Sequence, residues 1–402
     1  MKTLNSILFL LLLSVSIPVK NFGQTNSLSI SFDFFGTPIS ISVDPAFKVS
    51  SGYSPDAVEI ADFFEKISKT DYQPVIYQLL AIKSRLQLED WPYYQLIRNV
   101  AEKISPKAGN YYRYTLYKWF LMDQSGYETA LKTSNDKLLF YIRCDENIYN
   151  IPGYYKNDKQ FICLNYHDYG NHVDFQKERF TEISPVENAS LRSFSYKITR
   201  LPDFNTSSYK ERDISFQIND NEYRFKIKLN NEIKTLFANY PVVDYESYFN
   251  IPLSKETYES LIPVLKNQVS GMNKKAGVDF LMRFTRYAFM FAPDSKQFGG
   301  EKRLSPEETL LYDKSDCDDR AALFFYLVKE IYNLPMIVLA YPEHVTIAVK
   351  FAKPVGTPVV YKGEKYSVCE PTPQKTDLRI GQSIPGLNHS SFEVVYAYHP
   401  GN

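Results

Sequence analysis

The sequence predicts an α+β protein, in which helices and strands occur in separate blocks. Apolar residues recur at three- and four-residue spacing over residues 55–104 and again from Ser254, as expected of helices packed on a core. Around residues 185–250 the apolar period is two, which is typical of strands. Near the C-terminus, one helical pattern is followed by strand patterns. The chain therefore combines helical blocks with antiparallel sheets.

Composition sets the size and excludes one class of partner. The chain has 402 residues, of which 44% are apolar and 15% aromatic, enough for two or three packed domains. The 46 basic and 46 acidic residues cancel, and neither sign forms a long run. Nucleic acid is not expected as a partner, because no basic stripe is available for phosphates.

Residues 1–24 have the pattern of a secretory signal peptide. One lysine precedes an apolar run from Ile7 to Ile17, and polar residues with Gly23 follow. This run is too short for a comfortable membrane span, although an uncleaved anchor remains an alternative. We expect an exported protein, periplasmic or extracellular, with no membrane span after cleavage.

Residues 25–170 are predicted to form an N-terminal α+β domain. Alternating residues on either side of Gly36 and Pro38 predict a hairpin. Ser54 and Pro55 provide an N-cap and a first helical residue for the helices of residues 55–104. Residues 108–168 then predict another helix and two strands.

Residues 171–252 are predicted to form a β-rich, sandwich-like domain. The segments Ile214–Ile218 and Tyr223–Leu229 flank the turn sequence NDNE and predict a hairpin. Ser193–Ile198 and Val242–Phe249 are expected to be partner strands. The helical period returns in the third domain, residues 253–402.

Cys317 begins a helical pattern in the third domain that ends at Asn333-Leu334-Pro335. A loop of about two dozen residues precedes it, and loops of that length are usually functional. Free N–H groups at a helix start lower a thiol pKa, whereas Asp318 and Asp319 oppose this effect. We expect a free, reactive thiol with a lowered pKa and a histidine partner.

The best placed of the five histidines is His344, at the start of a predicted strand. Val345, Ile347 and Val349 alternate toward a core, so His344 faces the other side. Residues 359–372 predict a second strand. If the two strands pair antiparallel about Thr357, His344 lies directly opposite Glu370.

Two further expectations follow from the remaining cysteines and histidines. Cys369 precedes Glu370 and should point into the core as an inert packing residue. His167 and His172 lie in a polar loop, where scattered histidines usually bind nothing, and His344 has no second ligand at metal spacing. We expect no metal and no cofactor.

Residues 278–372 resemble the core of the transglutaminase-like superfamily, which has a papain-type arrangement of helix and antiparallel sheet. The similar motifs are SPEETLLYDKSDCDDRAALFFYLVKE, YPEHVTIAVKF and YSVCEPT. The resemblance implies that Cys317 is the nucleophile, His344 the base and Glu370 the orienting acid. Glutamate replaces the usual aspartate, and Ser315 stands where glycine is common.

The resemblance implies an exported cysteine enzyme that acts on amide bonds of protein or peptide substrates through a thioester. Acyl transfer to an amine, deamidation and hydrolysis all remain open, and the sequence does not assign an oligomeric state. The alternative is a non-catalytic exported binding or scaffold protein that retains the fold.

The chain also resembles itself at an offset of 207 residues. Residues 113–144 align without a gap on residues 320–351, and one extra residue in the hairpin places Cys163 on Cys369. The first copy has Asn110, Lys137 and Leu164 in place of Cys317, His344 and Glu370. We expect a degenerate N-terminal copy without the catalytic set, and no disulfide between Cys144 and Cys163.

Overall fold

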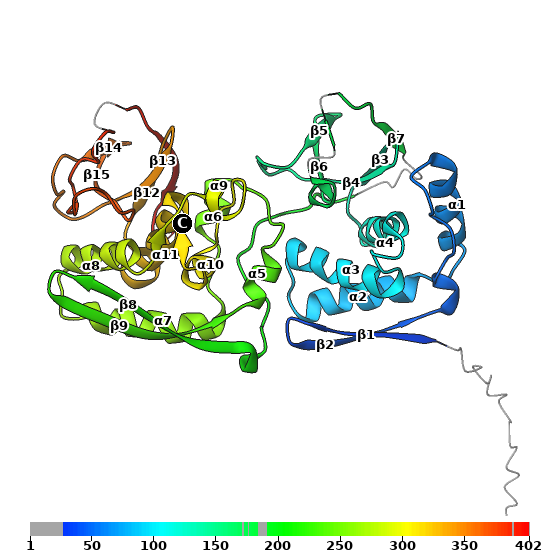
Figure 1. The fold of residues 1–402 in the computed structure, drawn as a ribbon, viewed down its shortest axis with the longest axis horizontal. Coiled ribbons are helices and arrows are strands. Elements are labelled where there is room, and N and C mark those ends of the chain that lie inside the picture. Colours follow the sequence, from blue (N-terminus) through cyan, green and yellow to red (C-terminus); the bar gives the residue numbers. More distant parts are fainter. Residues whose placement is uncertain (1–26, 171–172, 176, 184–190, 388–389, 402) are drawn as a thin grey trace, which may run out of the picture.

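A computed structural model describes residues 27–170, 173–175, 177–183, 191–387 and 390–401. The predicted signal peptide, residues 1–24, lies outside the described residues. The predicted α+β class is confirmed, since helices and antiparallel sheets occur throughout. Figure 1 shows two halves side by side, residues 27–183 and residues 209–401. Each half has a sheet, a layer of helices and a two-stranded hairpin.

The first half begins with the predicted hairpin, whose strands pair across Phe35 and Gly36. Helices α2 and α3 lie between this hairpin and α4 (Figure 1). These elements are β1 (Leu28–Phe34), β2 (Thr37–Val43), α1 (Ala57–Ser68), α2 (Gln73–Arg85), α3 (Asp90–Ile104) and α4 (Tyr111–Gln124).

The first sheet is antiparallel, with the strand order β5-β6-β4-β3-β7. Its strands are β3 (Thr129–Ser134), β4 (Lys137–Arg143), β5 (Gly153–Lys156), β6 (Lys159–Cys163) and β7 (Thr181–Ile183).

The second half repeats this plan with a longer helical layer. Its hairpin and helices are β8 (Tyr209–Ile218), β9 (Asn221–Asn230), α5 (Glu232–Leu236), α6 (Tyr245–Phe249), α7 (Lys255–Val269), α8 (Lys274–Tyr287), α9 (Asp294–Gln297), α10 (Pro306–Leu311) and α11 (Cys317–Tyr332). Its strands are β12 (Met336–Tyr341), β13 (His344–Val349), β14 (Val359–Tyr361), β15 (Glu364–Cys369) and β16 (Glu393–Tyr398), with two short parallel strands, β10 (Met290–Phe291) and β11 (Lys314–Ser315), before α11.

The two five-stranded sheets have one topology. The order β14-β15-β13-β12-β16 matches β5-β6-β4-β3-β7 strand for strand. Strands β3 and β12 begin and end 207 residues apart, as the sequence alignment predicts. The connections before the last helix differ, because residues 105–110 join α3 to α4 whereas residues 288–316 join α8 to α11. The second copy therefore carries an insertion beside Cys317.

The structure contradicts the predicted β-rich middle domain. Strand β7 belongs to the first sheet, and the β8–β9 hairpin packs on α8 through Phe216 and Phe225 against Phe284. The predicted strand Val242–Phe249 contains helix α6, which Asp244 caps by accepting a hydrogen bond from the backbone N–H of Ser247. Aromatic residues at three- and four-residue spacing favour a helix once such a cap is present.

The predicted partner strand Ser193–Ile198 forms only a single bridge in the described chain, between Phe194 and Cys144. The segment therefore lies at the ends of the inner strands β3 and β4 of the first sheet and contributes no strand of a separate sandwich in the described chain.

The region predicted as one strand over residues 359–372 is a hairpin. Lys362 and Gly363 both have positive φ, 47° and 80°, which is the geometry of a tight two-residue turn between β14 and β15. Strand β15 pairs with β13, with Ile347 opposite Cys369. This register is two residues away from the one centred on Thr357. A shift of two preserves the faces, so Cys369 lies in the core with Val345 and Ile347 as predicted.

One continuous hydrophobic core includes residues of both halves. Between them, the indole N–H of Trp91 on α3 donates a 2.8 Å hydrogen bond to the carbonyl of Leu236 on α5. Among the described residues, no helix combines the length and hydrophobicity needed to cross a bilayer.

Candidate active site

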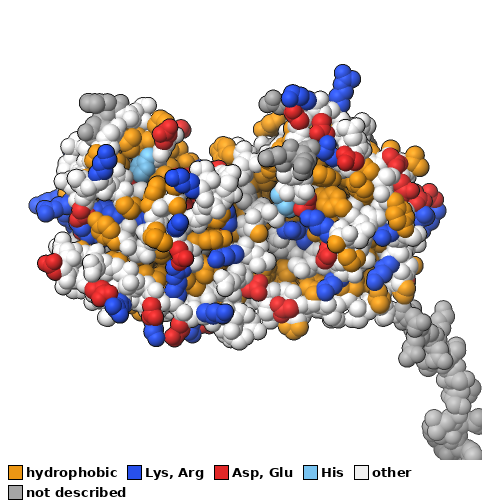
Figure 2. All heavy atoms as spheres, viewed as in Figure 1, with side chains coloured by type: hydrophobic (Ala, Val, Ile, Leu, Met, Phe, Trp, Pro, Cys, Tyr) orange, Lys and Arg blue, Asp and Glu red, His pale blue; other side chains and the backbone are white. Residues whose placement is uncertain are grey.

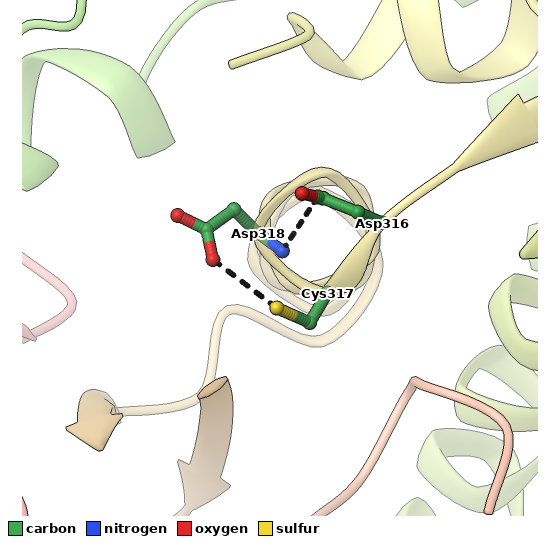
Figure 3. Close-up of side chains that lie close together, drawn as sticks. All are labelled: Asp316, Cys317 and Asp318. Carbon is green, nitrogen blue, oxygen red and sulfur yellow. Dashed lines mark hydrogen bonds between the residues drawn. The ribbon is translucent and has the colours of Figure 1, made fainter. Parts of the chain in front are cut away.

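Helix α11 begins at Cys317 because of a reciprocal cap. One carboxylate oxygen of Asp316 accepts the backbone N–H groups of Asp318 at 3.0 Å and Asp319 at 3.3 Å. The side chain of Asp319 in turn accepts the backbone N–H of Asp316 at 3.2 Å. Figure 3 shows the result, with Cys317 and Asp318 side by side on the first turn. The helix ends at Asn333, whose φ of 47° is left-handed.

His344 and Glu370 form a hydrogen-bonded pair, as predicted. The Nε2 atom of His344 lies 2.7 Å from Oε2 of Glu370. The other carboxylate oxygen of Glu370 accepts the backbone N–H of Thr372 at 2.7 Å, and only 1% of the Glu370 side chain is exposed. These two residues are not directly opposite in the ladder. The Glu370 side chain instead reaches His344 diagonally across the two paired strands.

Arg286 on α8 positions the end of β15. Its guanidinium donates to the carbonyl oxygens of Glu370 and Leu378, at 3.2 Å and 2.9 Å respectively. The side chain is buried and also pairs with Asp377 at 2.7 Å. Sequence reasoning missed this role, because nothing in the helical pattern of α8 indicates what its arginine contacts.

Cys317 lies beside the strand that carries His344. Helix α11, which begins at Cys317, packs against β13, and the backbone N–H of Val345, the residue after His344, acts to lower the pKa of the Cys317 thiol. The sulfur also lies 3.4 Å from Oδ1 of Asp318 (Figure 3). Within the described chain, no direct hydrogen bond joins the thiol to His344. Since Nε2 of His344 faces Glu370, Nδ1 is the ring nitrogen available to a thiol.

The expected lowering of the Cys317 pKa is wrong. Burial raises the pKa of this thiol, and the negative charges of Asp318 and Asp316 raise it further, against a smaller opposing effect of the Val345 N–H. The sequence-based prediction was that the helix start and a histidine partner together outweigh the neighbouring aspartates. Burial and two carboxylates outweigh the helix start, so this arrangement holds the sulfur as a thiol. The predicted absence of a disulfide is confirmed, since Cys317 and the other three cysteines are free.

The environment of His344 favours its charged form, whereas that of Cys317 favours the neutral thiol. Burial alone lowers the pKa of His344, but the hydrogen bond and charge of Glu370 outweigh it and raise the pKa above 6.5. Asp318 and Asp316 add to this increase. The imidazole is therefore well suited to hold a proton taken from Cys317.

The insertion before α11 supplies a cation to the site. The Nε atom of Arg303 lies 3.4 Å from Oδ2 of Asp318, and its guanidinium stacks over the ring of Tyr245 at 4.1 Å. Arg303 thus offsets part of the negative charge beside Cys317. In the sequence, the unusual length of the loop before Cys317 indicated a functional segment, but it did not identify Arg303.

A cavity of about 890 Å³ adjoins this group. Tyr245, Glu301 and Arg303 line it on the side of Cys317, and Asp145 and Glu146 line it from the first half. Figure 2 shows a notch between the halves on one face of the molecule. The cavity is connected to the first turn of α11 through Arg303, which lines the cavity and contacts Asp318.

Two groups of side chains bring possible metal ligands together among the described residues. Asp294, Asp316 and Asp319 place carboxylate oxygens within 4.8 Å of one another, and Asp316, Cys317 and Asp318 form the second group. The Asp316 and Asp319 carboxylates already accept the N–H groups of the helix cap. Burial raises the pKa of Asp294 to about 6, which favours a shared proton in this group.

The histidines that sequence reasoning set aside lie elsewhere. His172 is outside the described residues. His167 lies in the first half with Nε2 3.2 Å from Oδ1 of Asp168, far along the chain from the other candidates.

The equivalent positions in the first half have other roles. Asn110 caps α4 by accepting the backbone N–H of Arg113 at 3.0 Å. Lys137 begins β4, as His344 begins β13, and pairs with Glu178 at 2.9 Å. Leu164 is buried in the core. The repeated fold thus has no thiol, imidazole or carboxylate at these three positions.

No family model, curated protein or solved structure matches this chain.

Proposed function

We propose that this protein is a transglutaminase-like cysteine enzyme that cleaves or transfers amide acyl groups of protein or peptide substrates. The observation that carries the proposal is the 2.7 Å contact of His344 and Glu370 beside the thiol of Cys317. Helix-start thiol, strand histidine and carboxylate occur in the order and on the elements that such a mechanism needs.

In the proposed reaction, the Cys317 proton passes to Nδ1 of His344 as the sulfur attacks the amide carbonyl carbon. Glu370 stabilises the resulting imidazolium through Nε2–H. The backbone N–H of Cys317, which has no intrahelical acceptor at this position, is a candidate donor to the oxyanion. His344 then protonates the leaving nitrogen as the C–N bond breaks, and a thioester remains on Cys317.

The second step restores the enzyme. Water gives hydrolysis or deamidation, whereas a primary amine gives an amide-transfer product. In each case His344 removes a proton from the attacking group, and the Cys317 thiol leaves the acyl carbon. The cavity whose wall includes Arg303, the residue that contacts Asp318, is the proposed binding region for the rest of the substrate.

Mass spectrometry of the protein mixed with glutamine-containing peptides tests this proposal. We expect an acyl adduct on Cys317 and release of ammonia, both lost in Cys317→Ser and His344→Ala. Cys369→Ser is the matched control, because Cys369 is a core thiol in the same half. Ammonia release that persists in Cys317→Ser would contradict the assignment.

The raised pKa of Cys317 favours a second candidate, a non-catalytic exported binding protein with the same fold. It predicts no adduct with any peptide, and peptide binding that survives in Cys317→Ser. The same experiment therefore separates the two candidates.

A further inference from the structure

A second cavity lies beside the start of α4, between the first half and the segment after α5. It has a volume of about 740 Å³ and is bounded by α3, the first turn of α4 and the segment after α5. Tyr111 and Tyr114 of α4 line it, so it adjoins the helix start that is equivalent to that of Cys317. The cavity lined by Tyr245, Glu301 and Arg303 is separate, as the two cavities share no lining residue.

The wall of this cavity has an unused hydrogen-bond donor. Gln95 is only 7% exposed, and its Oε1 atom accepts a 2.9 Å hydrogen bond from Arg98. Its Nε2 atom is buried and has no hydrogen-bond partner in the described part of the chain. Buried donors are rarely left without an acceptor, so this amide indicates a missing acceptor.

The charged groups at this cavity are mainly cationic. Arg98 and Lys107 line it, and Arg98 forms no ion pair within the described residues. Glu102 also lines it, but its side chain accepts the backbone N–H of Lys107 at 2.9 Å. One guanidinium, one ammonium and one amide donor thus line the cavity, together with a single carboxylate.

A buried lysine lies behind the wall of this cavity. Lys118 on α4 is 1% exposed, and its Nζ lies 3.8 Å from Asp168 Oδ2 and 4.5 Å from the ring centre of Tyr114. Lys107 lies 2.6 Å from the other oxygen of Asp168, so two ammonium groups share one carboxylate. Burial lowers the pKa of Lys118 to about 7 despite Asp168. A nearby anion would favour its charged form.

We propose that the first half binds an oxyanion, a carboxylate or phosphate group, between Arg98, Lys107 and Gln95. The guanidinium supplies paired N–H donors, the Gln95 amide supplies the third, and Lys107 supplies charge. The first half is thus a ligand-binding module that uses the region beside the position equivalent to Cys317. This inference is independent of chemistry at Cys317.

Calorimetric titration of the full chain with inorganic phosphate, and with acetyl-dialanine bearing a free carboxylate, tests the proposal. The dialanine carboxamide is the matched ligand without the anion. We expect saturable binding of at least one anion and none of the carboxamide, with a parallel rise in the thermal midpoint. Phosphate alone would identify a phosphate-type ligand, and the peptide acid alone would identify a chain terminus.

Variants of the cavity wall complete the test. Arg98→Gln and Lys107→Gln should each weaken binding by about tenfold or more, as expected for loss of a charge-assisted contact. Lys103→Gln, an exposed residue of α3 outside the cavity, should bind like the wild type. Equal binding by all three variants, or no saturable binding of either anion, would overturn the proposal.

Discussion

Among the four cysteines, Cys317 is the partly exposed one, whereas Cys144, Cys163 and Cys369 are buried. Iodoacetamide added to the native protein should therefore modify Cys317 alone, and denaturation should expose the other three. Peptide mapping by mass spectrometry measures this. Native modification of Cys369 at a comparable rate would show that the core face of β15 is wrongly assigned.

The reactivity of Cys317 should depend on Asp318. Because the charge of Asp318 raises the pKa of the thiol, Asp318→Asn should lower that pKa and accelerate alkylation at mildly alkaline pH. The alkylation rate measured across pH should shift toward lower pH. Asp313→Asn is the control, since the Asp313 side chain is 78% exposed and lies outside the site. Equal rates in both variants would mean that Asp318 has no influence on the thiol.

The pKa of His344 should depend on Glu370. Burial lowers this pKa, and the hydrogen bond and charge of Glu370 raise it above 6.5 overall. The pair therefore stabilises the fold fully below the unfolded pKa of 6.5, and this stabilisation is lost as pH rises through the folded pKa.

Glu370→Gln should lower the His344 titration midpoint, as followed by NMR of the imidazole carbons. Glu364→Gln, on the same strand with a half-exposed side chain, should leave the midpoint unchanged. A midpoint unaffected by Glu370→Gln would exclude the orienting role of this glutamate.

At the scale of elements, the hydrogen bonds by which Asp316 caps α11 can be tested separately from the negative charge of its carboxylate. Asp316 accepts two backbone N–H groups, and asparagine caps helices about as well as aspartate. Burial, with the charges of Asp294 and Asp318, raises the pKa of Asp316. A raised carboxyl pKa means that stability from this group is full below 3.8 and falls as pH rises through the folded pKa.

Asp316→Ala should therefore cost about 1–2 kcal/mol at acidic pH, through loss of the cap, and less at mildly alkaline pH, where the substitution also removes an unfavourable charge. Asp316→Asn should retain the cap and be more stable than the wild type at mildly alkaline pH. Urea unfolding at acidic and alkaline pH measures both. A loss in Asp316→Asn equal to that in Asp316→Ala would show that the carboxylate charge is needed.

At the scale of the whole molecule, the two halves share one core and should unfold together. Both tryptophans, Trp91 and Trp119, lie in the first half, whereas Cys369 is buried in the second. Tryptophan fluorescence and alkylation of Cys369 should change at the same urea concentration. Two separate midpoints would show that each copy folds as an independent unit.

The sequence determined the features that depend on local pattern. Apolar spacing predicted α3, α4 and α11, and alternation predicted both hairpins and the core position of Cys369. Offset comparison predicted the repeated helix and strands, because equal spacing of apolar residues produces equal elements. The pairing of His344 with Glu370 also followed, since a register error of two residues leaves every side chain on its own face.

Only the tertiary structure decided what depends on contacts between distant segments. The aromatic spacing of residues 242–249 fits a strand or a helix, and in the structure Phe249 of the helix packs against Phe325 on α11. The Cys317 pKa was decided by burial and by two carboxylates, and Arg303 reached Asp318 through a long insertion. Local sequence determines the period of an element and the face on which each side chain lies. The pKa of one group, in contrast, depends on the burial and the charges contributed by every segment that the fold brings near it.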